Sequence, residues 1–126
     1  MVILDYKSSK PIYEQIIEQI KLNVMKQYLK PGDAIPSVRK LALELEITPG
    51  TVAKAYQELE RQQIIETIRG KGTFIAGEIE LKPDDKKVLE IKKRLQTELM
   101  ELKMMGYSRS MVVDLVTGVY EEMCVC

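Results

Sequence analysis

The amino-acid sequence predicts a mainly α-helical protein that contains one small β-hairpin and ends in two further helices. Three observations predict this fold class. Two short helical patterns, at residues 37–45 and 48–60, follow each other almost without a break. Two runs rich in β-branched residues flank a turn with two glycines at residues 69–72, which is typical of a hairpin. Residues 84–126 hold two longer apolar patterns separated by a glycine.

The first predicted helix begins at Pro11, after an extended lead-in over residues 2–9, and runs to about Tyr28. Ser9 is a candidate N-cap for it. Apolar side chains recur every four residues and widen into a stripe, as on the buried face of an amphipathic helix. This stripe consists of Ile12, Tyr13, Ile16, Ile17, Ile20, Val24 and Met25.

The next segment begins with a chain break and leads into a short helix. Residues 31–33 read Pro-Gly-Asp, which ends helical structure, and residues 34–35 are expected to make a short strand. Ser37 is a favourable N-cap, and the apolar spacing after it predicts one short helix. Its inward residues are Val38, Leu41, Ala42 and Leu45.

A second short helix follows after Glu46 and Ile47 alone. We expect Thr48 to cap it through its side chain, and Pro49 suits the first helical position, where no N–H is needed. The inward residues are Val52, Ala55, Tyr56 and Leu59, so Tyr56 is expected in the core. Two short helices joined so tightly must cross steeply, which is the helix-turn-helix arrangement.

The outward face of this second helix is small or polar, so it can approach a DNA groove closely. It carries Gly50, Thr51, Ala53, Lys54 and Gln57. Strands at residues 64–68 and 73–76 then form a hairpin with a basic tip, Arg69-Gly70-Lys71. Helix, helix-turn-helix and hairpin in this order make a winged helix-turn-helix. We assign residues 1–77 to this DNA-binding domain and residues 78–83 to a linker.

Residues 84–126 are predicted to form an αα-hairpin. Asp84 or Asp85 caps a helix that runs to about Met105, Gly106 ends it, and Ser108 caps a last helix over residues 111–123. Two helices alone cannot bury both stripes, so a second copy is the expected partner and the protein a homodimer. The expected dimerisation residues are Val88, Ile91, Leu95, Leu99, Leu102, Val112, Leu115, Val116, Val119 and Met123.

Composition excludes several other classes of protein. A chain of 126 residues without histidine lacks a His-based catalytic or metal site. No apolar run is long enough to span a bilayer, and Asp5 interrupts the apolar start, so we expect a cytoplasmic protein. Cys124 and Cys126 do not indicate a disulfide framework or, without further ligands, a metal site. We therefore expect neither cofactor nor metal.

Charge supports nucleic-acid binding only weakly. The net charge is zero, whereas proteins that bind DNA without sequence preference are strongly basic. Residues 1–77 hold 11 Lys or Arg against 9 Asp or Glu, a net charge of +2. The sign agrees with DNA binding, but the excess is far smaller than that of proteins that bind DNA without sequence preference.

Three blocks of the sequence resemble the signature of GntR-family bacterial transcription regulators. They are Pro36–Ala42, Thr51–Glu60 and Arg69–Phe74, in the family's order and spacing, and the opening Pro11–Ile16 also fits. The resemblance covers about residues 9–77. The short two-helix end is similar to the YtrA-like subfamily, whose members lack a large effector domain.

The resemblance implies a dimer that binds an inverted-repeat operator, usually as a repressor, and that in this subfamily often controls transporter genes. The DNA-contacting positions that it implies, together with Lys54 from the outward face, are Ser37, Arg39, Thr48, Gly50, Thr51, Lys54, Arg69, Gly70 and Lys71. Many members have arginines where this chain has Pro49 and Ala53, so part of the family's base readout is absent here.

Two other functions compete with a DNA-binding regulator. Winged helices also bind proteins, and zero net charge is compatible with such an interaction module. Some GntR relatives carry an aminotransferase-like domain that uses pyridoxal phosphate, but this chain is too short for it. The Gly70-Lys71-Gly72 turn lacks the upstream glycine and following helix of a P-loop. We expect a non-enzyme, and a small-molecule effector remains unidentified.

Overall fold

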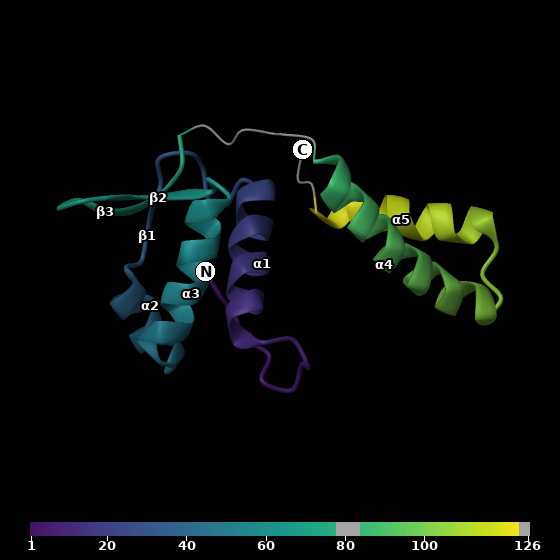
Figure 1. The fold of residues 1–126 in the computed structure, drawn as a ribbon, viewed down its shortest axis with the longest axis horizontal. Helices are drawn as coiled ribbons and strands as arrows, with labels where there is room; N and C mark the ends of the chain where they lie inside the picture. Colours follow the sequence, from purple (N-terminus) through teal and green to yellow (C-terminus); the bar gives the residue numbers. More distant parts are fainter. Residues whose placement is uncertain (78–83, 124–126) are drawn as a thin grey trace. The chain divides into compact units, whose positions relative to one another are not determined.

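The computed structural model describes residues 1–77 and 84–123, which form two compact units (Figure 1). The first unit, here called the head, contains α1 (Ile12–Met25), β1 (Ala34–Ile35), α2 (Val38–Leu45), α3 (Pro49–Arg61), β2 (Ile65–Ile68) and β3 (Gly72–Ile75). The second unit, the tail, contains α4 (Asp85–Met104) and α5 (Arg109–Met123). The predicted fold class is confirmed. The predicted linker at residues 78–83, Cys124 and Cys126 lie outside the described residues.

The core of the head lies where α1 and α2 pack against α3 (Figure 1). The apolar stripes predicted for these helices supply most of its buried side chains, and Tyr56 is only 3% exposed, as predicted. The largest fully buried side chains are Ile16, Ile20, Leu41, Val52, Leu59 and Ile75. The prediction for Met25 was wrong: it is 46% exposed, because α1 ends at this residue and the core face closes with Val24.

The three strands form one antiparallel sheet in the order β1-β3-β2. The hairpin of β2 and β3 is the predicted wing, and it projects beyond the helices (Figure 1). In its register Ile65 pairs with Ile75 and Ile68 with Gly72. The third strand, β1, is the short one expected before Pro36, and Ala34 pairs there with Phe74. The wing is therefore tied on one side to the segment that leads into α2.

Polar side chains at helix starts confirm several predictions and correct two. Ser37, Asp84 and Ser108 each accept a hydrogen bond from the backbone N–H three residues on, at 3.1 to 3.2 Å. Ser9 does not cap α1, which starts after Pro11 without any side-chain cap. Thr48 is the N-cap residue of α3, yet its hydroxyl lies 3.0 Å from that of Thr51 and bonds no backbone amide.

The predicted lead-in is a packed part of the head. Val2 is buried in the core, and Leu4 packs against it. Three amide side chains, four residues apart on α1, hydrogen-bond the main chain of alternate residues in this segment: Gln15 with Asp5, Gln19 with Ile3 and Asn23 with Met1. Side chains one helical turn apart lie on the same face, so α1 holds residues 1–5 of this segment.

The tail has no buried side chain among its described residues. Of the predicted dimerisation residues, Leu99, Leu102, Val112 and Met123 are partly buried. The others are between 40% and 58% exposed: Val88, Ile91, Leu95, Leu115, Val116 and Val119. Both helices are amphipathic, as predicted, and their apolar faces stay largely open to solvent within a single chain.

Candidate nucleic-acid interface

The turn between α2 and α3 is fixed by backbone geometry and by one apolar side chain. Glu46 adopts a left-handed conformation with φ of 57° and ends α2. The N–H of Ile47 then donates to the carbonyl of Ala42 at 3.0 Å, and the Ile47 side chain packs against the core. These contacts hold the first turn of α3 beside the end of α2, which is the helix-turn-helix geometry that the sequence predicted.

The start of α3 is exposed on the surface of the head. Thr48, Pro49 and Gly50 are exposed, and Thr51 is half-buried. A Cβ added at Gly50 would meet no atom within 4 Å. The space beside Gly50 is therefore open, and no neighbouring group requires a glycine there. Together with the small side chain of Ala53, this surface admits the close approach of another molecule.

Arg39 lies in the first turn of α2 and is exposed. In the described part of the chain its guanidinium makes no hydrogen bond or ion pair, so it is not paired with a neighbouring glutamate. Ser37, two residues earlier, uses its hydroxyl oxygen to cap α2 and keeps its O–H as a donor. Both side chains are available to a ligand in front of α2.

The wing tip presents two more cations. Arg69 and Lys71 are exposed, and neither forms an ion pair with any other residue that the structure describes. Gly70 lies between them with φ of +81°, a conformation that a residue with a Cβ adopts only with strain. The N–H of Lys71 donates to the carbonyl of Ile68 at 2.9 Å and closes the turn. The tight turn thus fixes the spacing of the two cations.

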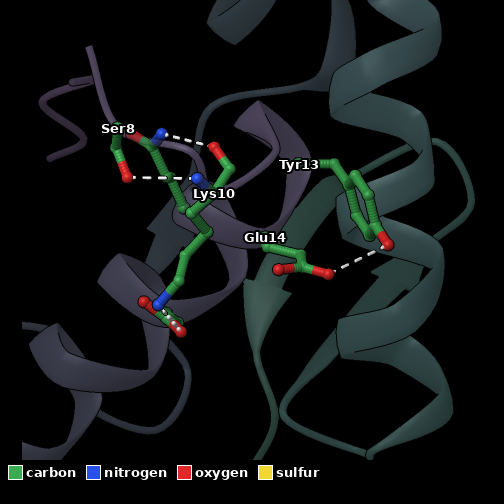
Figure 2. A network of polar contacts seen from close by, with 6 residues as sticks. Ser8, Lys10, Tyr13 and Glu14 are labelled. Carbon is green, nitrogen blue, oxygen red and sulfur yellow. Dashed lines mark hydrogen bonds and ion pairs between the residues drawn. The ribbon is translucent and has the colours of Figure 1, made fainter. Parts of the chain in front are cut away.

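Lys54 is exposed on α3, and its ammonium lies against an aromatic ring. Its Nζ lies 3.9 Å from the centroid of the Tyr13 ring on α1. The Tyr13 hydroxyl in turn donates to a carboxylate oxygen of Glu14 at 3.3 Å (Figure 2). Tyr13 packs against the core, as its place in the apolar stripe predicted, but helical spacing gives no signal of its contact with Lys54.

Tyr56 links α3 to the start of α2 from inside the head. Its hydroxyl donates to the carbonyl of Pro36 at 2.6 Å. Burial, with a smaller contribution from the charge of Glu44, raises the pKa of Tyr56 well above its ordinary value, so the hydroxyl stays a donor. The loop that carries Ser37 is therefore held against α3, and the two helices keep their spacing.

A further contact of the same kind lies at the other end of α2. The hydroxyl of Tyr6 donates to the carbonyl of Leu45 at 3.2 Å, which satisfies one acceptor in the last turn of the helix. No periodic signal predicts this pair, because 39 residues separate its members.

Two negative findings concern the described residues only. None of their helices is long and apolar enough to cross a membrane. No group of three or more acidic or cysteine side chains among them is arranged to hold a metal ion.

The fold and this exposed surface define a winged helix-turn-helix DNA-binding transcription regulator. Residues 12–75 match the family described as "Bacterial regulatory proteins, gntR family". The chain belongs to the GntR family, as its sequence blocks predicted.

Three known proteins show how far the likeness extends. The transcriptional repressor YtrA of Bacillus subtilis is 46% identical over 80% of this chain and 78% of its own length. A crystal structure titled a transcriptional antiterminator from Listeria monocytogenes superposes with a TM-score of 0.85 at 38% identity, over 98% of this chain and 92% of that one. The DNA-binding domain of AraR, solved with an operator, covers 60% of this chain and 92% of its own at 26% identity and a TM-score of 0.51.

Proposed function

We propose that this protein is a transcriptional repressor that binds an inverted-repeat operator as a homodimer. The observation that carries the proposal is a set of exposed cations, Arg39 on α2 and Arg69 and Lys71 on the turn between β2 and β3, that form no ion pair within the described residues. Such cations neutralise phosphates, and the small residues between them allow the helix to enter a major groove. The name of the Bacillus subtilis relative supports repression.

Each element has a distinct part in this proposal. The first residues of α3, Thr48, Gly50 and Thr51, face base edges. Arg39 and Ser37 bind the phosphate backbone or a guanine in front of α2, since arginine can grip either with two hydrogen bonds. Arg69, Gly70 and Lys71 of the wing reach the minor groove or the adjacent backbone. The operator complex of AraR supports this use of the head.

The tail supplies the second copy in this proposal. A symmetric partner would cover the open apolar faces of α4 and α5. The two helices of each copy would then pack around one four-helix core. A two-fold dimer places two heads on one side of a duplex, and their spacing sets the distance between half-sites. The regions proposed are therefore residues 1–77 for DNA, 78–83 as the link and 84–126 for dimerisation.

The resemblance to YtrA-like regulators extends the proposal in two ways. The protein controls a transporter operon, and a small-molecule effector releases it from DNA. An effector acts only if it binds one arrangement of the two copies better than the other.

The test is selection of genomic fragments with the full chain, followed by titration of the recovered duplex with wild type and Arg39→Ala. We expect Arg39→Ala to weaken binding about tenfold or more, since a bidentate charged contact is lost. Lys93→Ala, which removes an exposed cation from α4, is the control matched for charge and should bind as wild type does. Affinity that is equal for all duplexes and insensitive to salt would instead favour a protein-interaction module.

A further inference from the structure

The contact between Lys54 and Tyr13 joins the recognition helix α3 to α1. Lys54 is exposed, and its ammonium lies 3.9 Å from the centre of the Tyr13 ring. Tyr13 is half-buried, and α1 packs directly against α3. The ring therefore has a fixed position relative to the backbone of Lys54.

Glu14 adds a contact at the hydroxyl end of the ring. The Tyr13 hydroxyl donates to its carboxylate at 3.3 Å (Figure 2). A phenol that donates to an anion carries more electron density in its ring, and the ring face attracts a cation through that density. A hydrogen bond therefore links Glu14 to Tyr13, and a cation–π contact links Tyr13 to Lys54 on α3.

The consequence for Lys54 is that its charge is held on one side of the recognition helix. A free lysine side chain distributes its ammonium over many rotamers. Here the ring draws the ammonium toward α1, although Lys54 lies one helical turn after Gly50 on the same face of α3. When a recognition helix lies in the major groove, base edges lie below its outward face and phosphates border it on both sides.

We propose that Tyr13 positions Lys54 to meet a backbone phosphate at the rim of the groove, so that Lys54 contributes affinity without sequence preference. This inference rests on the proposed function, in which α3 enters the groove. Tyr13 is a positioning residue, because it acts on DNA only through Lys54.

The experiment titrates the operator and a scrambled duplex of equal length with wild type, Lys54→Ala, Tyr13→Leu and the double variant, over a series of salt concentrations. Lys54→Ala should weaken binding to both duplexes by the same factor, about tenfold, and lower the slope of log affinity against log salt by about one. Tyr13→Leu should weaken binding roughly two- to fivefold in the wild-type background. In the Lys54→Ala background it should cause no further loss.

Two controls separate positioning from folding. Tyr13→Phe keeps the ring and removes only the hydroxyl, so it should retain most of the affinity that Tyr13→Leu loses. In the free full-length protein, the ring should shift the NMR signals of the Lys54 Cε protons upfield, and Tyr13→Leu should abolish that shift. This second readout needs no DNA, so it reports the contact even if a variant binds poorly for another reason.

Three results would overturn the inference. A larger loss for the operator than for the scrambled duplex with Lys54→Ala would mean that Lys54 reads a base. Full additivity of the two single changes would mean that Tyr13 acts independently of Lys54. Wild-type affinity in Lys54→Ala would remove Lys54 from the interface while leaving the proposed function intact. Failure of wild type itself to bind any duplex would overturn the proposed function first.

Discussion

The head and the tail of this protein use the same kind of amphipathic helix with opposite results. In the head, the stripes of α1, α2 and α3 meet in one core, where Ile16, Ile20 and Leu59 are fully buried. In the tail, α4 and α5 bury no described residue, and Leu95 is 49% exposed. The comparison teaches that an apolar stripe predicts a buried face, but the number of elements around it decides whether one chain can bury that face.

The variant with the largest expected effect changes the closed core of the head. Leu59→Ala removes a side chain with no exposed surface and leaves a cavity between α3 and its neighbours. We expect a loss of about 2–5 kcal/mol in the free energy of unfolding. Chemical denaturation followed by circular dichroism measures it. Leu43→Ala is the matched control, because Leu43 is 79% exposed on α2, and its change should stay within about 0.5 kcal/mol.

The variant with the next largest expected effect tests whether a second copy of the chain covers the apolar faces of the tail. Leu95→Glu places a charge on the open stripe of α4 and should prevent dimerisation, because an unpaired charge in an apolar interface is strongly unfavourable. Sedimentation equilibrium should give twice the chain mass for wild type and the single-chain mass for the variant. Operator affinity should fall with it, since one head makes only half of the contacts.

Lys93→Ala lies on the polar face of α4 and should leave the mass unchanged. A single-chain mass for wild type at the concentration that saturates the operator would contradict the dimer. The exposed apolar stripe of α4 could then not be explained by dimerisation.

The smallest effect concerns a pair on the surface of the head. Hydrogen bonds from Arg61 and Gln62 lower the pKa of Glu58 from 4.5 to about 2. Because the folded-state pKa is the lower one, the ionised carboxylate stabilises the fold above pH 4.5, and this contribution is lost as the pH falls toward 2. Solvent screens the pair, so the contribution is small. Glu58→Gln should lower the melting temperature slightly at pH 7 and by less at pH 2, where about half of the folded-state carboxylate is protonated, as calorimetry would show.

Local patterns in the sequence predicted most of the head. The spacing of Val52, Tyr56 and Leu59 identified the buried face of α3, and Ser37 marked the start of α2. These signals are readable because helix periodicity and capping depend on residues within one or two turns of each other. The same reasoning failed for Thr48, since its hydroxyl had a second partner in Thr51 that competes with the backbone.

Sequence patterns alone were enough to predict the class of fold, the positions of its helices and wing, and the family. Three contacts appear only in the folded protein: the first residues pack along α1, the Tyr6 hydroxyl reaches Leu45, and the Lys54 ammonium contacts the Tyr13 ring. These partners lie far apart in the chain, from 39 to 41 residues for the last two pairs. No periodic pattern connects residues at such separations, because their contact depends on how whole helices pack.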